Sequence, residues 1–229
     1  MKNNCFLLRV FKIIGSILIL GVGMSACAAL PGSGSTSWKE EALLHDGSKI
    51  IVERTVQRGG RHEVGQQPPI REQSLIFAFP HTQQKLRWED NYSEDVGAAN
   101  FNVRMIEIVN GTAYVWASPA GCLSYNKWGR PNPPYVIFKN EGKSWQRIAL
   151  QELPGAIKRP NLISSSPDTE VEKSGTRFIT SEMVAGLNAS YRQPEFRSIL
   201  REPLSKERCP QYSSGPKAPN PIAPDISVK

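Results

Sequence analysis

Short apolar runs rich in branched and aromatic residues recur along the middle of the chain, and they predict β-strands. Glycine, proline, asparagine and aspartate separate the runs, which is typical of strands joined by turns. The predicted strands are residues 49–57, 74–79, 86–89, 101–109, 112–118, 135–139 and 145–150.

The phase of the apolar residues changes within the run 101–109. Phe101, Val103 and Met105 alternate with polar residues, whereas Ile106 and Ile108 continue in the opposite phase. Because successive side chains of a strand point to opposite faces, a one-residue bulge near Met105 would keep both sets on the core face. The alternative is that the second half of the strand is buried on both sides.

Three turn signals indicate how the strands connect. The dipeptides DG at 46–47 and NG at 110–111 favour two-residue hairpin turns, because glycine and asparagine accept positive φ angles. The tripeptide NEG at 140–142 joins the last two predicted strands. Most neighbouring strands are therefore expected to be antiparallel.

Helix signals occur only late in the chain. Ser166, Pro167 and Asp168 supply an N-cap, a proline in the first turn and an early acid, and they predict a short helix that reaches Lys173 and ends at Gly175. Further short helices are expected from residue 180 or 181 and over 195–200. The predicted fold is mainly β: an antiparallel β-sandwich or open barrel with a small helical C-terminal appendage.

Residues 1–26 predict an export signal of the lipoprotein type. Three basic residues precede an apolar run at 13–22, which is about half the ~20 residues that a membrane-spanning helix needs, and the sequence MSAC follows at 24–27. Cys27 would then carry the lipid and begin the mature chain. The alternatives are ordinary signal-peptidase cleavage nearby or an uncleaved anchor.

Composition divides the remaining chain into three parts. Residues 27–37 comprise the lipidated cysteine and a flexible linker rich in glycine, serine and proline. Residues 38–212 are long enough for a single β-rich domain with its own core. Residues 213–229 form a proline-rich tail that is expected to be disordered.

The net charge is positive but does not indicate a nucleic-acid partner. The formal charge is +7, and loss of the three basic residues of the signal lowers it to +4. Acidic residues are interspersed with the basic ones, so no stripe is present that could follow a phosphate backbone. The basic balance instead allows weak attraction to anionic lipid headgroups.

Cysteine usage agrees with export. Cys5 would leave with the signal and Cys27 would be acylated, which leaves Cys122 and Cys209. Two cysteines in an oxidising compartment favour a disulfide, which would tie the C-terminal segment to the domain. The alternative is that both are buried free thiols.

The chain lacks recognisable catalytic or cofactor motifs. His45, His62 and His81 have no ligand spacing, so neither a metal nor a cofactor is expected. No phosphate-binding loop, dinucleotide fingerprint or G-x-S-x-G is present. Ser124 and Lys127 match the S-x-x-K pattern of penicillin-binding proteins, but the surrounding glycines and prolines argue against the helix that this chemistry needs.

The segment 116–135 is the main candidate for a binding surface, because amphipathic rings with polar edges often bind glycans or proteins. The alternative is that its rings point inward as core and its prolines only stiffen the connection. The candidate residues are Trp116, Tyr125, Lys127, Trp128, Arg130 and Tyr135.

A second candidate is the long connection between the first two predicted strands. Its arginines could bind an anionic headgroup or phosphate, although a solvated loop has the same composition. The residues of this weaker anion-binding candidate are Arg58, Arg61, His62 and Arg71.

Two phrases, HDGSKIIVERTVQRGGRHEVGQQPPIREQS at 45–74 and GCLSYNKWGRPNPPYVIFK at 121–139, resemble a family of uncharacterised exported proteobacterial proteins. The resemblance covers most of residues 38–212. It implies a Gram-negative envelope setting and transfers no activity or site residue. Ala28 occupies the place where enterobacterial lipoproteins retained in the inner membrane have aspartate, so the outer membrane facing the periplasm is favoured.

Three functions follow from these observations. The first is a membrane-tethered, non-enzymatic module that binds an envelope protein or glycan, with exposed aromatic residues around Trp128. The second is an envelope hydrolase or transferase acting on peptidoglycan or glycans, which needs a cleft where His62, Glu63 or Asp95 meets a second carboxylate. The third is a purely structural lipoprotein without a pocket.

The Cys27→Ser substitution tests the anchor. We predict that it moves the protein from the membrane fraction to the soluble fraction, because only weak headgroup attraction remains once the lipid is absent. Fractionation of cells that express either form provides the measurement. Retention of Cys27→Ser in membranes would instead identify an uncleaved anchor.

Overall fold

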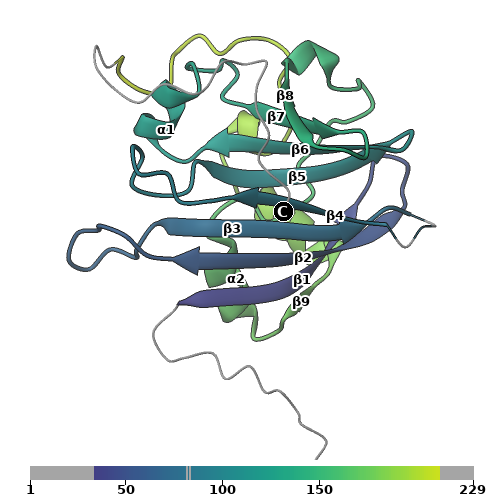
Figure 1. The fold of residues 1–229 in the computed structure, drawn as a ribbon, viewed down its shortest axis with the longest axis horizontal. Coiled ribbons are helices and arrows are strands. Elements are labelled where there is room, and N and C mark those ends of the chain that lie inside the picture. Colours follow the sequence, from purple (N-terminus) through teal and green to yellow (C-terminus); the bar gives the residue numbers. More distant parts are fainter. Residues whose placement is uncertain (1–33, 81, 83, 212–229) are drawn as a thin grey trace, which may run out of the picture. The chain divides into compact units, whose positions relative to one another are not determined.

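Two β-sheets form the framework of the computed structural model, which describes residues 34–80, 82 and 84–211 (Figure 1). The first sheet has the strand order β4-β3-β2-β1-β9 and the second has the order β5-β6-β7-β8. Neighbouring strands pair antiparallel, except for β1 and β9, which pair parallel. Within the described residues these sheets do not close into a barrel, which is consistent with the predicted sandwich.

The predicted signal, Cys27 and the proline-rich tail lie outside the described residues. The strands are β1 (Ser35–Leu43), β2 (Lys49–Arg58), β3 (Ile70–Ala78), β4 (Lys85–Asp90), β5 (Phe101–Val109), β6 (Thr112–Pro119), β7 (Val136–Asn140), β8 (Trp145–Ile148) and β9 (Phe178–Ile179). The α-helices are α1 (Cys122–Lys127), α2 (Pro167–Ser174) and α3 (Ser181–Ala189), and the 3₁₀ helices are η1 (Leu150–Glu152) and η2 (Pro194–Phe196).

All seven predicted strands are confirmed, and the structure adds β1 and β9 to them. β1 begins at Ser35, three residues inside the predicted linker, because its backbone pairs with β2 from Ser35 opposite Gln57 onward. The hydroxyl groups of Ser37 and Thr55 also bond across this pair at 2.9 Å. β1 was not predicted because the acidic residue Glu40 occupies an inward-pointing position, which interrupts the alternation of apolar and polar residues.

Large aromatic side chains fill the space between the sheets. Trp88 of β4 packs against Phe138 of β7 at 5.9 Å between ring centroids, and Phe101 of β5 lies 5.3 Å from the same ring. Trp145 of β8 reaches across to donate a hydrogen bond to the carbonyl of Arg87 at 2.7 Å. Burial of each large apolar side chain stabilises the fold by roughly 1.5–3 kcal/mol.

The bulge predicted in β5 is present, but it does not keep Met105 on the core face. Val103 pairs with Ala117 and Met105 pairs with Trp116, so Arg104 is the extra residue. Met105 therefore points to the outer face of the second sheet, where it packs in a second apolar cluster with Trp116. The second half of β5 is buried on both faces, as the alternative prediction stated, because a further layer of chain covers the outer face of the second sheet.

This further layer is the C-terminal strap, defined as residues 199–211. Ile199 and Leu200 pack on the cluster that contains Trp116 and Tyr135. The backbone N–H of Leu200 donates to the hydroxyl oxygen of Tyr135 at 3.2 Å. The strap thereby turns the outer face of the second sheet into interior.

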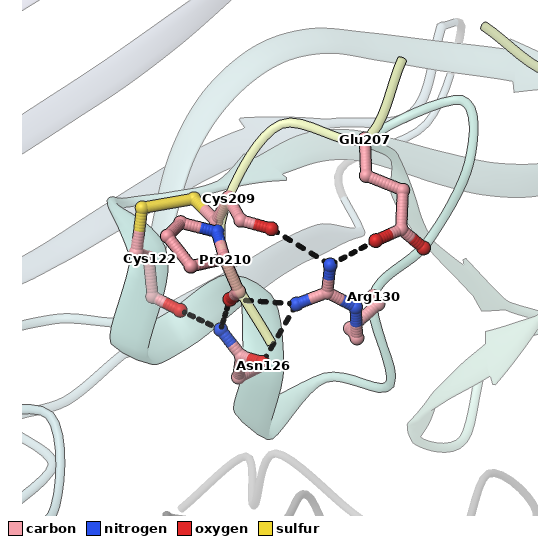
Figure 2. Close-up of a disulfide and its surroundings, with 6 residues drawn as sticks. All are labelled: Cys122, Asn126, Arg130, Glu207, Cys209 and Pro210. Atoms are coloured by element: carbon pink, nitrogen blue, oxygen red, sulfur yellow. Dashed lines mark hydrogen bonds and ion pairs between the residues drawn. A yellow bond between two sulfur atoms is a disulfide. The ribbon is translucent and has the colours of Figure 1, made fainter. Parts of the chain in front are cut away.

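The strap is fastened by the predicted disulfide, which is confirmed: Cys122 and Cys209 are bonded with their Cα atoms 5.5 Å apart (Figure 2). Arg130 points at the same segment and donates to the carbonyls of Cys209 and Pro210 at 2.7 and 2.9 Å. The Arg130 guanidinium also pairs with Glu207. Covalent and polar contacts thus hold the strap at one place.

Helices α2 and α3 cover the part of the first sheet that the second sheet does not reach. Val171 of α2 and Val184 of α3 pack with Trp38 and Val56 in a third apolar cluster. α2 ends at Gly175 with φ of 69°, as predicted, but Ser166 makes no side-chain cap bond. The predicted helix over 195–200 is replaced by the shorter η2.

A buried carboxylate joins the two sheets at the end of β4. Asp90 accepts hydrogen bonds from both the backbone and the side chain of Asn100 at 3.0 and 3.1 Å, and from the backbone of Phe101 at 2.8 Å. Gln73 donates a fourth at 3.1 Å. Burial raises the pKa of Asp90 to about 6, against which these hydrogen bonds act.

The raised pKa of Asp90 predicts a contribution to stability that depends on pH. This contribution is fully present below the pKa of an unfolded aspartate and is lost as pH rises through about 6. A difference of two pKa units corresponds to about 3 kcal/mol. We expect the free energy of unfolding of Asp90→Asn, measured with urea between pH 4 and 7.5, to lack this loss. The control Glu94→Gln, at an exposed acid, should keep the wild-type slope, and equal slopes for all three proteins would contradict the assignment.

Candidate binding groove

The aromatic residues of the segment 116–135 lie inside the protein and present no exposed ring face. Trp116 and Tyr125 are at most 1% exposed, and Tyr135 and Trp128 are 5% and 9% exposed. Trp128 packs against Phe101 at 4.6 Å, and Trp116 meets Tyr135 at 4.8 Å. These rings belong to the core, as the alternative prediction stated. A flat aromatic surface around Trp128 is therefore not available to a ligand.

The prediction that no helix forms in this segment is wrong. Gly121 and Gly129, with φ of 92° and 82°, lie just outside α1 and bound the helix without interrupting it. Ser124 nevertheless donates its hydroxyl to the carbonyl of Asn100, while Lys127 pairs with Asp95 at 2.7 Å. The hydroxyl and the amine thus have separate partners, which is not the S-x-x-K arrangement.

The four anion-binding candidates are not brought together. Arg58 forms a two-bond ion pair with Asp168, at 2.5 and 2.7 Å, and is used in holding α2. Arg71 lies over the ring of Tyr92 at 4.8 Å. Arg61 and His62 are exposed in the connection between β2 and β3.

The acid–base cluster expected of a hydrolase does not form at the residues proposed for it. The ring of His62 bonds to the carbonyl of Gly60 at 3.0 Å, and Glu63 accepts from Gln66 at 3.2 Å. No group of three or more histidine, cysteine or acidic side chains with metal-binding geometry occurs within residues 34–80, 82 and 84–211. The close histidine–carboxylate pair lies elsewhere, at His45.

A hollow of about 390 Å³ lies between the β1–β2 turn, the first half of α3 and the segment that precedes α2. Much of its wall is apolar or small: Leu43, Leu44, Ala156, Pro160, Val184 and Ala185. A second hollow, of about 420 Å³, lies along the second half of α3 and against η2. Both hollows are lined by Arg159, Pro160 and Ala185, so they adjoin along α3; the two together are called the α3 groove.

One face of α3 provides a wall of the groove. Ser181, Ala185 and Ala189 recur every four residues, which places them on the same side of the helix. Eight residue steps at 1.5 Å make this wall about 12 Å long. The small alanine side chains leave room that a larger residue would fill.

Asn161 holds the opposite wall of the groove, the segment before α2, in position. Its side-chain oxygen accepts from the backbone N–H of Ile106 at 3.0 Å, and its amide donates to the carbonyls of Ile106 and Leu43 at 2.8 and 3.0 Å. The backbone N–H groups of Asn161 and Leu162 also donate to the carbonyl of Arg104. Asn161 therefore connects the end of β1 to the free edge of β5 and fixes Arg159 and Pro160 beside α3.

The charged residues of the groove are unevenly distributed. Lys158, Arg159 and Arg197 are exposed, and none of them forms an ion pair with any residue in the described part of the chain. The carboxylate in the lining, Glu107, is buried against His45. The groove thus combines a largely apolar lining with positive charges that have no acidic partner.

His45 and Glu107 form a close pair at the β1 end of the groove. The imidazole Nδ1 lies 3.0 Å from the carboxylate of Glu107, which also accepts the backbone N–H of His45 at 2.9 Å and that of Ile108 at 3.0 Å. Burial raises the pKa of the Glu107 carboxyl, whereas the hydrogen bonds from His45 lower it. The pair holds the β1–β2 turn against β5 with a fixed ring orientation.

Sequence reasoning missed this groove because its residues come from separate regions of the chain. His45 precedes β2 and Glu107 belongs to β5, 62 positions apart, so no local pattern pairs them. Lys158 and Arg159 precede a proline in a segment without periodicity. The one local signal was the run KRPN at 158–161, in which two cations are followed by residues typical of turns.

No family model matches the chain, and comparison with curated proteins and with solved structures finds no match either. Among the helices of the described ranges, none has the length and apolar character needed to cross a membrane. The case for the α3 groove as a site rests on its geometry.

The bonds of Asn161 predict its contribution to stability. Asn161→Ala removes three hydrogen bonds, each with a typical net contribution of about 1 kcal/mol, so we expect the free energy of unfolding to fall by about 3 kcal/mol. Urea denaturation provides the measurement. Asn102→Ala, on the same strand as Ile106 but without a side-chain hydrogen bond in the described structure, is the matched control and should change stability by less than about 1 kcal/mol.

Proposed function

We propose that this protein is a lipid-anchored envelope protein, tethered through Cys27, that binds an anionic and partly apolar segment of another envelope protein. The observation that carries the binding part of the proposal is the α3 groove, in which Lys158, Arg159 and Arg197 are left without acidic partners around an apolar floor. Exposed cations beside a concave apolar surface favour a ligand with carboxylates and aliphatic side chains.

A protein segment fits this groove better than a glycan does. Sugar rings are commonly held against exposed aromatic faces, and the aromatic residues first considered for this role are buried. The groove is about 12 Å long along α3, which accommodates three or four residues of extended chain at about 3.3 Å each. A short peptide with alternating acidic and aliphatic residues therefore matches both its length and its chemistry.

The test is titration of soluble protein, residues 28–229, with a pentapeptide of alternating aspartate and leucine whose ends are blocked. We expect saturable binding that weakens with added salt, because exposed charges are screened. The double variant Arg159→Gln/Arg197→Gln should bind at least tenfold more weakly. Isothermal titration calorimetry measures both affinities.

Two controls make the outcome specific. Arg61→Gln removes an exposed cation from the β2–β3 connection, outside the groove, and should bind the peptide like the wild type. A peptide in which asparagine replaces each aspartate should bind weakly to all variants. Equal affinity of the wild type and the double variant for the acidic peptide would refute the assignment of the groove.

A further inference from the structure

His45 lines the α3 groove with a partly exposed side chain. Its Nδ1 is bonded to Glu107, whose side chain is only 4% exposed, while the side chain of His45 is 22% exposed. Within the described residues, Nε2 of His45 has no hydrogen-bond partner. The two ring nitrogens therefore have different environments: Nδ1 is bonded to a buried carboxylate, whereas Nε2 has no partner among the described residues, and both His45 and Glu107 line the same hollow.

Glu107 determines what the ring can do. Its carboxylate already accepts two backbone N–H groups, from His45 and Ile108, so its position is fixed independently of the ring. A carboxylate at hydrogen-bond distance from Nδ1 places the imidazole proton on that nitrogen. Nε2 is then a free acceptor when the ring is neutral and becomes a charged donor when the ring takes up a second proton.

The other charged groups around His45 come from each neighbouring element. Asp46 belongs to the same turn, and its carboxylate is occupied by Ser48. Lys158 and Arg159, from the segment before α2, line the same hollow. On the side of α3, the acids Glu41 and Glu182 are both paired with Lys49. Cations without partners therefore line the same hollow as the ring, and a bound anion would neutralise them.

We infer that an acidic group of the ligand binds at Nε2 of His45 and that its binding is coupled to the uptake of one proton by the imidazole. An anion beside Nε2 favours the protonated ring, and Glu107 compensates the new positive charge from the other side. Because linkage is reciprocal, protonation strengthens binding by the same factor.

This inference rests on the proposed function, since it concerns the same groove and the same acidic ligand. It adds a contact residue and a direction: affinity rises as pH falls. The aspartate–leucine pentapeptide is again the probe. Its carboxylates stay ionised across the range from pH 6 to 8, so the peptide itself contributes no pH dependence.

The experiment measures peptide affinity by calorimetry at pH 6.0, 7.0 and 8.0, each in two buffers that differ in ionisation enthalpy. We expect the wild type to bind about tenfold more tightly at pH 6.0 than at pH 8.0, with proton uptake on binding. His45→Gln should still bind, with an affinity that changes less than twofold over this range and without proton uptake.

Two further variants test the pairing and the specificity. Glu107→Gln leaves a neutral partner that no longer compensates an imidazolium, so it should reduce proton uptake although His45 is present. His62→Gln removes an exposed histidine outside the groove and should keep the full pH dependence. Retained circular dichroism spectra establish that the variants are folded.

The outcomes separate the two proposals. Absence of binding at every pH would overturn both the binding groove and the role of His45. Binding by the wild type with the same affinity at pH 6.0 and 8.0 would overturn the role of His45 alone, as would an unchanged pH dependence in His45→Gln.

Discussion

The arrangement of the sandwich around its helical side depends on one buried ion pair, between Glu40 of β1 and Arg54 of β2. Both side chains are at most 2% exposed, and Nη1 of Arg54 lies 2.9 Å from Glu40. The same carboxylate accepts the indole N–H of Trp38 at 3.0 Å and the backbone N–H of Ile163, while Arg54 donates to the Ile163 carbonyl at 3.2 Å. Removal of one partner would leave a buried charge uncompensated, which typically costs 3–5 kcal/mol. The pair therefore bonds both the backbone N–H and the carbonyl of Ile163, which is more than a hundred positions away in the sequence. These bonds fix where the chain comes back to the first sheet before α2.

The position of the groove follows from that return. Ile163 is held by the ion pair, and two residues earlier Asn161 is held between β1 and β5, so the intervening backbone has little freedom. Arg159 and Pro160 are consequently placed beside α3, and the ion pair of Arg58 with Asp168 fixes α2 from the other side. Polar bonds to named backbone groups, rather than apolar packing alone, determine the width of the groove. Such bonds are directional, so they hold the groove in one shape, as the proposed binding role requires.

The opposite side of the molecule is built on a different principle. There the outer face of the second sheet carries Trp116 and Tyr135, which would form an exposed apolar patch without the C-terminal strap. The disulfide and Arg130 hold this strap at one point. At a second point Arg201 of the strap donates to the carbonyls of Leu153 and Ile157. Aromatic residues that resemble a binding surface in composition are thus used for cohesion, and the proposed binding surface consists instead of small residues and unpaired cations on the helical side.

The sequence by itself determined most strands, the two-residue turn at Asn110-Gly111, the bulge beside Met105 and the starts of α2 and α3, because each depends on the period of apolar residues or on the φ preferences of glycine, asparagine and proline. The connection between β1 and β2 is longer than the two-residue turn predicted at 46–47, since Leu43 pairs with Lys49. It also favoured the disulfide between Cys122 and Cys209 over two free thiols, because Cys5 and Cys27 were assigned to the predicted signal and lipid anchor. Tertiary structure alone decided that Glu40 points inward, that α1 forms between two glycines, and that Trp128 is core rather than surface. It also decided that His45 meets Glu107. These facts depend on contacts between residues far apart in the chain, and local pattern carries no information about which distant charge or carbonyl will be present to satisfy a buried group.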